Sequence, residues 1–497
     1  STSGREIAHN LGSVPGMILV KRTDGAESWV VFHRTQGAAY AELESTGAFY
    51  SGDVRWGSQL HSTTHFSLDD HNAVNGTNKT YVAYLFAHND SGDGGFGPDG
   101  DQDIIKCGSF TSDSSGDVAE IDLGFEPQWI MLKKTSSTGD WRIGDVMRGD
   151  TVDNSFQALK ANTSDAESTL VMSRPTATGY KIDTGFGTNA TGIYMAIRRG
   201  PLAPPTAATE VFAPNFYGTN GYTGYLGAPV DMSMLGYPAS GGSKNAIITA
   251  RILPNTNASN GVGLVTSSTA AETALNMTYD NMVGVSPVGA YSTNIISWNW
   301  KRAPSFFEAL AYTGDNVSGR TISHNLGVAP EMIWVKKRSE TGDWNVYHSG
   351  LGPTKTIWLN QSSTGNTHQD YWYNTAPTSS VFSVGGGNPN NYTTRTYIAY
   401  LFATLAGVSK VGSVTHSGTT NVDCGFSAGA RFVLLKRTDA TGDWYLWDSV
   451  RGIIAGNDPY LLLNTTAAQV TNTDFIDPLN AGFTISDNFT DGDYIFY

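Results

Sequence analysis

Short apolar runs recur along the whole chain, and turn-forming residues separate them. In stretches such as 15–22 (PGMILVKR) and 29–33 (WVVFH), apolar side chains occupy successive or alternate positions over the length of a strand. This pattern is typical of β-strands that are buried on one or both faces. Helical periodicity is not sustained anywhere, and Gly, Asn, Asp and Pro lie between the runs. The spacing therefore predicts an all-β protein built from antiparallel sheets.

The runs return as an ordered set with a period of about 100 residues. An apolar strand that ends in lysine comes first, with Lys21, Lys133, Lys336 and Lys436 at equivalent positions. A tryptophan strand follows, and it reads Gly-Asp-Trp at 139–141, 342–344 and 442–444. A third strand runs into Asn, Ser or Thr, and a tyrosine-rich strand closes the set. Residues 205–303 carry a degraded copy that lacks the lysine and has Ala246 in place of the tryptophan.

This repetition predicts a tandem array of five antiparallel, jelly-roll-like β-sandwich modules, each with its own core and with tryptophans facing inward. The expected modules are 1–90, 104–200, 205–303, 305–405 and 408–497. The stretch that begins at Pro201 (PLAPPTAAT) has the proline density of a stiff spacer, so the other neighbours are expected to pack closely. The first and last copies lack segments that the others have, so we expect the chain to be part of a longer polypeptide.

Composition narrows the classes of function. The 497 residues carry a formal charge of −14, and only 15% of them are charged. A nucleic-acid groove or an anionic membrane surface needs clustered Lys and Arg, so neither partner is expected. Membrane insertion is not expected either, because no apolar run approaches the roughly 20 residues that span a bilayer. The chain has two cysteines, too few for a disulfide framework, and we expect packed free thiols.

Catalytic signatures are weak. The Gly-x-Ser-x-Gly pattern occurs at 425–429, where it lies in the turn before an apolar strand and not between a strand and a helix as in a nucleophile elbow. The recurring acids Asp140, Asp343 and Asp443 each precede a tryptophan, and glycoside hydrolysis would need two such carboxylates about 5 to 10 Å apart. The favoured interpretation is architectural, with the aspartate closing a turn and the tryptophan filling the sandwich core. We therefore predict that the protein is not an enzyme.

Two segments have side chains that suit a metal ion. The loop 89–103 is rich in glycine and in carboxylates, which are calcium ligands, although it lacks the spacing of an EF-hand. The candidate ligands are Asp93, Asp99, Asp101 and Asp103, and the alternative is a solvated acidic linker. His61 and His65, with Asp69 and His71 nearby, are a weaker candidate for a transition metal, and a polar surface strand is the alternative.

Aromatic side chains are dense in two segments, 364–374 and 216–227, where the copies deviate from one another. Aromatic rings beside asparagine and threonine are suited to stacking on a sugar and hydrogen bonding to it. The alternative is that these rings belong to strands packed on a neighbouring copy. The candidate binding residues are Tyr371, Trp372, Tyr373, Tyr222 and Tyr225.

Four motifs together carry a resemblance: HNLGVAPEMIWVKKR from His324, TGDWNVYHSGLG from Thr341, DSVRG with LLLNTTAA, and YIAYLFA from Tyr397. With them the sequence resembles a module repeated in large virion proteins of tailed bacteriophages, especially marine ones, often labelled tail fibre or left uncharacterised. The resemblance spans nearly the whole chain and lends no catalytic residues. It implies a structural or adhesive particle component.

The expected function is therefore that of a tail fibre or appendage that contributes to recognition of host-surface glycans, because repeated weak sites give avidity. The expected partners are other virion proteins, host polysaccharide and copies of itself in a homo-oligomer, with a trimer favoured. The expected location is the surface of the extracellular virion. The alternatives are a purely structural virion element such as a capsid decoration, knob or tail adaptor, a polysaccharide depolymerase, and a bacterial surface adhesin.

Overall fold

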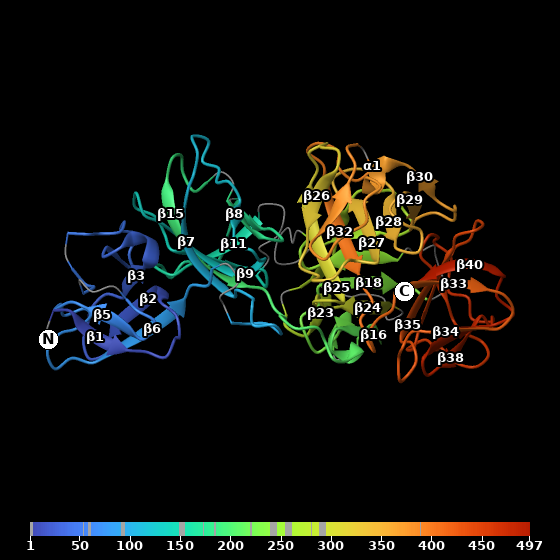
Figure 1. The fold of residues 1–497 in the computed structure, drawn as a ribbon, viewed down its shortest axis with the longest axis horizontal. Coiled ribbons are helices and arrows are strands. Elements are labelled where there is room, and N and C mark those ends of the chain that lie inside the picture. Colours follow the sequence, from blue (N-terminus) through green and yellow to red (C-terminus); the bar gives the residue numbers. More distant parts are fainter. Residues whose placement is uncertain are drawn as a thin grey trace. The chain divides into compact units, whose positions relative to one another are not determined.

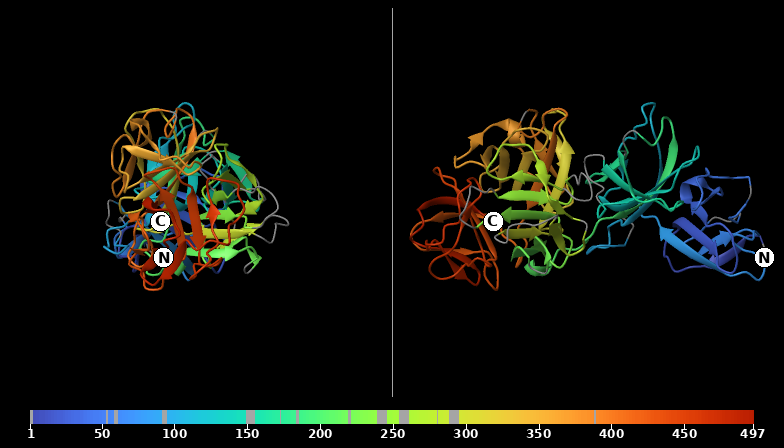
Figure 2. Two further views of the ribbon diagram at one scale, coloured as in Figure 1. Left: turned by 90° about the vertical axis from the view of Figure 1, so that its right-hand side faces the viewer. Right: turned by 180° about the vertical axis from the view of Figure 1, so that it is seen from behind.

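The all-β prediction is confirmed by the computed structural model, in which strands make up nearly all regular structure (Figures 1 and 2). The structure describes residues 3–52, 54–57, 61–90, 95–148, 155–171, 173–182, 185–218, 221–238, 246–253, 261–279, 281–287, 295–387 and 389–497. Over these residues helix is limited to α1 (Gln369–Trp372) and two 3-10 turns. No helix in the described ranges is long and apolar enough to cross a membrane.

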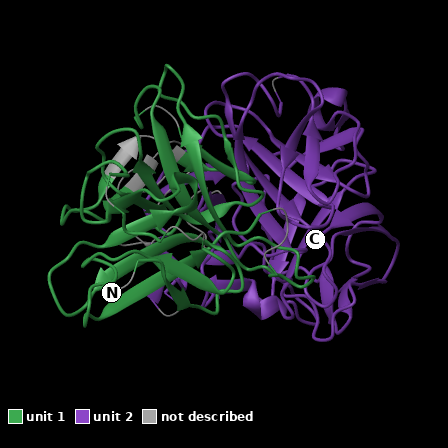
Figure 3. Cartoon of the chain, turned by 60° about the vertical axis from the view of Figure 1, so that its left-hand side comes forward, with its two compact units in different colours: residues 1–202 green, residues 203–497 purple. Residues whose placement is uncertain are grey.

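The chain divides into two compact units, Ser1–Leu202 and Ala203–Tyr497 (Figure 3). The boundary falls inside the proline-rich stretch that the sequence predicts to be a stiff spacer. Each unit is described by itself below.

One strand order recurs along the chain, and we call the five stretches that show it repeats 1 to 5. In repeat 4 the main sheet has the order β25-β32-β27-β28-β29-β30, so the last long strand lies between the first and the second. Repeats 2, 3 and 5 show the same order, and each repeat has a second, smaller sheet. The residue boundaries expected for five modules stay a prediction.

Unit 1 contains repeats 1 and 2. Repeat 1 consists of β1 (Arg5–Ala8), β2 (Pro15–Arg22), β3 (Val30–His33), η1 (Arg34–Gln36), β4 (Tyr40–Glu42), β5 (His65–Leu68) and β6 (Tyr81–Ala87). Repeat 2 consists of β7 (Ile105–Thr111), β8 (Ile121–Asp122), β9 (Pro127–Lys134), β10 (Arg142–Asp145), β11 (Ser155–Lys160), β12 (Ser168–Val171), β13 (Ser173–Pro175), β14 (Gly179–Ile182) and β15 (Thr191–Arg198).

Unit 2 contains repeats 3, 4 and 5. Repeat 3 consists of η2 (Ala208–Glu210), β16 (Phe212–Phe216), β17 (Gly224–Tyr225), β18 (Met232–Gly236), β19 (Ile247–Ala250), β20 (Gly261–Val265), β21 (Thr273–Leu275), β22 (Met277–Thr278), β23 (Gly284–Pro287) and β24 (Ile296–Trp300). Repeat 4 consists of β25 (Phe307–Thr313), β26 (Arg320–Ser323), β27 (Met332–Lys337), β28 (Trp344–His348), β29 (Lys355–Trp358), β30 (Asn366–Thr367), α1, β31 (Val381–Val384) and β32 (Thr396–Phe402). Repeat 5 consists of β33 (Gly412–His416), β34 (Thr420–Asp423), β35 (Phe432–Arg437), β36 (Trp444–Asp448), β37 (Leu461–Leu462), β38 (Ile476–Leu479), β39 (Gly482–Ile485) and β40 (Gly492–Phe496).

The central strands of a main sheet are buried on both faces. In β27, Ile333 and Val335 face a core that belongs to repeat 4 alone, and this core includes residues of the small sheet β26–β31. Met332 and Trp334 alternate with them and face a second core. Because successive side chains of a strand point to opposite faces, a continuous apolar run serves both layers.

Each repeat has a core of its own, as expected, and the second core, which the sequence did not predict, is shared between repeats. In unit 2 one cluster joins buried residues of repeats 3, 4 and 5, among them Ile248, Val346 and Leu446 at equivalent positions of β19, β28 and β36. In unit 1 a similar cluster joins Met17 and Val31 of repeat 1 to buried residues of repeat 2. The repeats within a unit therefore depend on one another for burial of their apolar faces.

The shared core predicts cooperative unfolding of unit 2. A fragment of residues 203–497 is expected to unfold in a single calorimetric transition, because separating any one repeat would expose the core of all three. The measurement is differential scanning calorimetry of that fragment beside the full chain. Separate transitions for three repeats would contradict the shared core.

Candidate functional site

The lysines that mark the first strand in repeats 2, 4 and 5 are fully buried. The Nζ of Lys336 donates to the carbonyl oxygen of Gly342 in its own repeat at 2.6 Å and to that of Thr269 in repeat 3 at 2.9 Å. Each equivalent lysine makes the same two kinds of bond: Lys133 to Gly139 and Thr46, and Lys436 to Gly442 and Ser362. Each lysine therefore ties its repeat to the preceding one.

The Gly-Asp-Trp motif makes the second part of this contact. The Gly342 N–H donates to the carbonyl of Thr269 at 2.8 Å, and the indole Nε1 of Trp344 donates to that of Val265 at 2.8 Å. The same bonds recur from Gly139 to Thr46, Trp141 to Glu42, Gly442 to Ser362 and Trp444 to Trp358. We call this set of contacts the joint. The motif tryptophans thus fill the space between repeats, not the interior of one sandwich as the sequence suggested.

The aspartate of the motif holds an asparagine. Asp343 Oδ1 accepts from Asn360 Nδ2 at 2.8 Å, and Asn360 Oδ1 accepts from the backbone N–H of Trp344 at 2.9 Å. Equivalent pairs are Asp140 with Asn162 and Asp443 with Asn464. The predicted role of these aspartates in closing their own turn is therefore corrected, because each fixes the third strand against the tryptophan strand.

Burial controls the charge of the joint lysines. It lowers the pKa of Lys336 to about 8, and the carboxylate of Asp343 acts in the opposite direction. Burial likewise lowers the pKa of Lys133 and of Lys436 to about 8. At neutral pH the ammonium group is thus retained among carbonyl oxygens, where its hydrogen bonds offset part of the cost of desolvation.

Repeat 3 lacks the joint donors. Gly236 of β18 and Ala246 occupy the positions of the lysine and the tryptophan, and a Cβ at Gly236 would collide with Trp298 and contact Leu461 of repeat 5. Other bonds connect repeats 3 and 5: Trp298 Nε1 donates to Asp448 Oδ2 at 3.1 Å, and Thr266 Oγ1 donates to the carbonyl of Leu463 at 2.7 Å. Repeats 3, 4 and 5 therefore contact one another pairwise, as a ring of three around one core.

A cavity of about 340 Å³ lies in unit 2 between repeats 3 and 5. Phe212 and Trp300 of repeat 3 line it, together with Lys410, Arg431 and Tyr497 of repeat 5. Arg431 Nη1 donates to the Phe212 carbonyl at 2.9 Å, and burial lowers the pKa of Arg431. Aromatic walls beside two cationic groups suit a small ligand with an apolar face and an acidic group.

The predicted binding residues lie elsewhere, and one of them is not available at the surface. Trp372 of α1 is 1% exposed and packs edge-on against Tyr347 in the core of repeat 4, which corrects its assignment as a surface ring. Tyr373 follows it and is exposed, whereas Tyr371 is half-buried. Tyr222 and Tyr225 are also half-buried, with ring centroids 5.7 Å apart.

The predicted metal ligands do not converge within the described residues. Asp93 lies outside them, Asp99 and Asp101 are exposed, and Asp103 is buried 3.6 Å from Lys106. Over the described ranges no group of three His, Cys, Asp or Glu side chains could hold a metal ion, which also applies to His61 and His65. Burial lowers the pKa of His61 to about 4.

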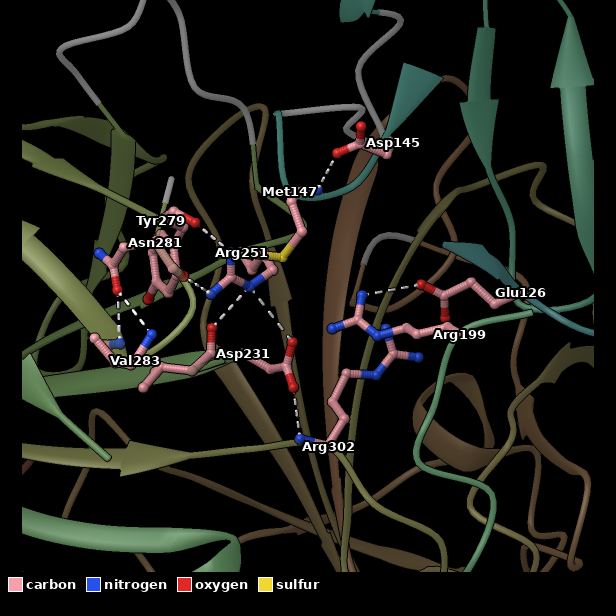
Figure 4. A network of polar contacts seen from close by, with 12 residues as sticks. Glu126, Asp145, Met147, Arg199, Asp231, Arg251, Tyr279, Asn281, Val283 and Arg302 are labelled. Atoms are coloured by element: carbon pink, nitrogen blue, oxygen red, sulfur yellow. Dashed lines mark hydrogen bonds and ion pairs between the residues drawn. The ribbon is translucent and has the colours of Figure 1, made fainter. Parts of the chain in front are cut away.

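Repeat 3 contains a network of buried charged side chains (Figure 4). Arg251 lies 3.7 Å from the carboxylate of Asp231, and its guanidinium donates to the carbonyls of Val230 and Tyr279. Asp231 also accepts from the backbone N–H of Arg302 at 2.7 Å. In unit 1, Arg199 lies 3.4 Å from the carboxylate of Glu126. The Arg251 guanidinium thus donates to backbone carbonyls of its own repeat, which ties the network to the fold of repeat 3.

The structure thus reveals two features that the sequence did not assign, the joint contacts and the cavity. A lysine recurring on the apolar face of a strand was a usable signal for the joint, because such a position requires a buried partner. The cavity had no local signal, since Phe212 and Arg431 are far apart in the chain and meet only across two repeats.

A family model described as "Domain of unknown function (DUF7483)" matches residues 1–201 and 249–496. A search of curated proteins finds no match, and a search of solved structures finds none either. The unmatched residues 202–248 include Gly236 and Ala246, at which repeat 3 departs from the joint.

Removal of a joint tryptophan should destabilise unit 2. We expect Trp344→Ala to lower the free energy of unfolding by about 3–5 kcal/mol, because it leaves a cavity in the shared core and removes the indole hydrogen bond to the Val265 carbonyl. The matched control is Trp29→Ala, at the half-exposed equivalent position of repeat 1, with an expected loss below about 1 kcal/mol. Urea denaturation followed by circular dichroism measures both, and equal losses would contradict the assignment.

Acid should weaken the contacts made by buried histidines. His33 Nε2 donates to the Tyr194 carbonyl of repeat 2 at 3.1 Å, and burial lowers the pKa of His33 to about 4. Burial also lowers the pKa of His348, at the equivalent position of repeat 4, to about 4. Between their ordinary pKa near 6.5 and about 4 the unfolded chain binds more protons, so stability falls as the pH drops through that window.

At pH 5 this effect should reach about 2 kcal/mol for each histidine. The measurement is urea denaturation at pH 7 and pH 5 for the native chain and for the variant His33→Gln/His348→Gln. The variant should lose less stability between the two pH values than the native chain does. An unchanged pH dependence would show that other groups cause it.

Proposed function

Since the chain belongs to the DUF7483 family, whose description assigns no activity, we propose a function from the geometry. The protein is a non-catalytic structural and adhesive component of an extracellular particle. In keeping with the sequence resemblance, the particle is the virion of a tailed bacteriophage, and the chain forms part of a tail fibre or appendage that recognises host-surface glycans. Other virion proteins and copies of the chain itself are the proposed partners.

The joint is the observation that carries the proposal. The lysine, the aspartate and the tryptophan that recur in the sequence could each take part in binding or catalysis. In the structure they instead form the contacts between one repeat and the preceding one. A chain whose repeated polar motif serves assembly is suited to a rigid scaffold. Glycoside hydrolysis gains no support, because Asp140, Asp343 and Asp443 lie in different repeats and each holds an asparagine.

The adhesive part of the proposal rests on the cavity in unit 2. Rings of Phe212 and Trp300 offer apolar surface, and Lys410 and Arg431 favour a negatively charged group. A sugar acid combines an apolar ring face, hydroxyl groups and a carboxylate, which fits this lining. The alternative of a purely structural virion element, such as a capsid decoration, knob or tail adaptor, is favoured by the burial of Trp372.

Binding to acidic glycans tests the proposal. The full chain should bind acidic polysaccharides of host cells on a glycan array, and Ala428→Trp, which fills the mouth of the cavity, should reduce binding at least about tenfold. Ala467→Trp, at an exposed loop of the same repeat outside the cavity lining, is the matched control and should bind as the native chain does. If no acidic glycan binds, the structural alternative gains support, and imaging of the labelled chain on the particle decides its position.

A further inference from the structure

Repeat 1 exposes a strand whose near-identical copy is buried in repeat 4. Residues 81–87 (YVAYLFA) and 397–403 (YIAYLFA) differ only at the second position. Tyr400 is fully buried in the shared core of unit 2, whereas the equivalent Tyr84 is 49% exposed. Since the same apolar sequence is present, the difference lies in what covers it.

The donor half of a joint is already assembled on this face. Trp29 stacks on Tyr84 with ring centroids 6.0 Å apart, as Trp344 stacks on Tyr400 at 6.4 Å. The backbone N–H of Trp29 donates to a carboxylate oxygen of Glu44 at 3.0 Å, so Glu44 takes the place of the joint asparagine.

Over the described ranges Lys21 makes only one of the two hydrogen bonds that a joint lysine makes. Its Nζ donates to the Glu27 carbonyl, which matches the bond from Lys336 to Gly342. Lys336 also donates to Thr269 of the preceding repeat, but within the described residues Lys21 has no second carbonyl acceptor. In the same part of the chain the indole N–H of Trp29 has no acceptor, and both side chains are half-exposed instead of buried.

In the part of the chain that the structure describes, the main sheet of repeat 1 also lacks the edge strand that pairs with the last long strand in the other repeats. In repeat 4 the edge strand β25 pairs with β32, and the equivalent of that pair recurs in repeats 2, 3 and 5. Over the described residues no strand pairs with the outer edge of β6. An apolar strand with one free edge and one uncovered face favours the addition of another β-structure.

Unit 1 thus has two repeats where unit 2 has a ring of three. Repeat 2 has a loop that matches the acceptor loops, which are the segments whose carbonyls accept from a joint lysine and tryptophan. The acceptor carbonyls in repeat 4 lie two residues before and two after Asn360, at Trp358 and Ser362. The same offsets from Asn162 give Lys160 and Ser164, whose carbonyls meet no joint lysine or tryptophan in the described residues of unit 1.

We propose that the face formed by Lys21, Trp29 and Tyr84 docks a further repeat of this same family, one that does not lie among the 497 residues, and that this repeat completes unit 1 as a ring of three. The occupant presents two backbone carbonyls four residues apart, as Val265 and Thr269 do in repeat 3. The donors on this face match that spacing, and they are the same donors that form the joint three times in this chain. An unrelated partner would have no reason to match them. The proposal is independent of glycan binding.

Hydrogen exchange of the native chain is the first test. Residues 25–29 and 81–87 should exchange at least about tenfold faster than the matched residues 340–344 and 397–403, because only the latter are covered by a neighbouring repeat and only β32 is paired on both edges. Mass spectrometry of peptides from the full chain measures all four segments in one sample. Equal protection of the two sets would overturn the proposal, since the face would then already be covered.

Supplying the repeat is the second test. A copy of residues 203–317 is joined to Ser3 of the full chain, because SGRTISHNLG from Ser318 aligns with SGREIAHNLG from Ser3. This extension provides both an acceptor loop and the missing edge strand. Residues 25–29 and 81–87 should then become protected by at least about tenfold, and unchanged exchange would overturn the proposal.

Three variants of the extended chain distinguish docking from general stabilisation. Trp29→Ala, or the milder Lys21→Met, should return residues 25–29 to fast exchange, whereas Trp344→Ala in unit 2 should leave them protected. Sedimentation of the native chain identifies the rival occupant. If the chain self-associates and Trp29→Ala abolishes the association, a second copy covers the face and the proposed occupant is wrong.

Discussion

A buried ammonium group needs hydrogen-bond acceptors, and in this protein the acceptors lie on a neighbouring repeat. Lys133, Lys336 and Lys436 have no exposed surface, and each receives one carbonyl from its own loop and one from the repeat before it. Without the neighbour, the ammonium loses a bond and the tryptophan beside it loses its cover. Folding of one repeat is therefore coupled to the presence of another by electrostatics as well as by apolar burial.

The two-faced strands impose the same dependence on the apolar side chains. Ile333 and Val335 complete the core of their own repeat, whereas Met332 and Trp334 need the other repeats of the unit. A single repeat in isolation would present the second set to water, and large exposed apolar surfaces favour association. The compact unit is accordingly the pair or the trio of repeats, although the strand order identifies the single repeat as the structural building block.

Periodicity was enough to predict the all-β class and the recurring landmarks, because alternation and turn residues act locally, and proline density marked the stretch in which the boundary between the units falls. The shared core was not predicted, for a physical reason. A run such as MIWV at 332–335 places apolar side chains on both faces of its strand, and the sequence does not show whether the second face packs on the same repeat or on a neighbouring one. Trp372 was assigned to the surface because a short aromatic segment between turns gives no sign of its burial. The cavity beside Arg431 depends on contacts across repeats that no local pattern encodes.

The joint has a direction, since donors belong to the later repeat and acceptors to the earlier one. Gly236 and Ala246 remove the donors at one position of unit 2, and there the first repeat meets the last through Leu461 and other contacts. The absence of the joint donors thus identifies the repeat with which a ring of three begins. Insertion of a single copy would leave one set of carbonyls or lysines unmatched, whereas duplication in threes would preserve every match.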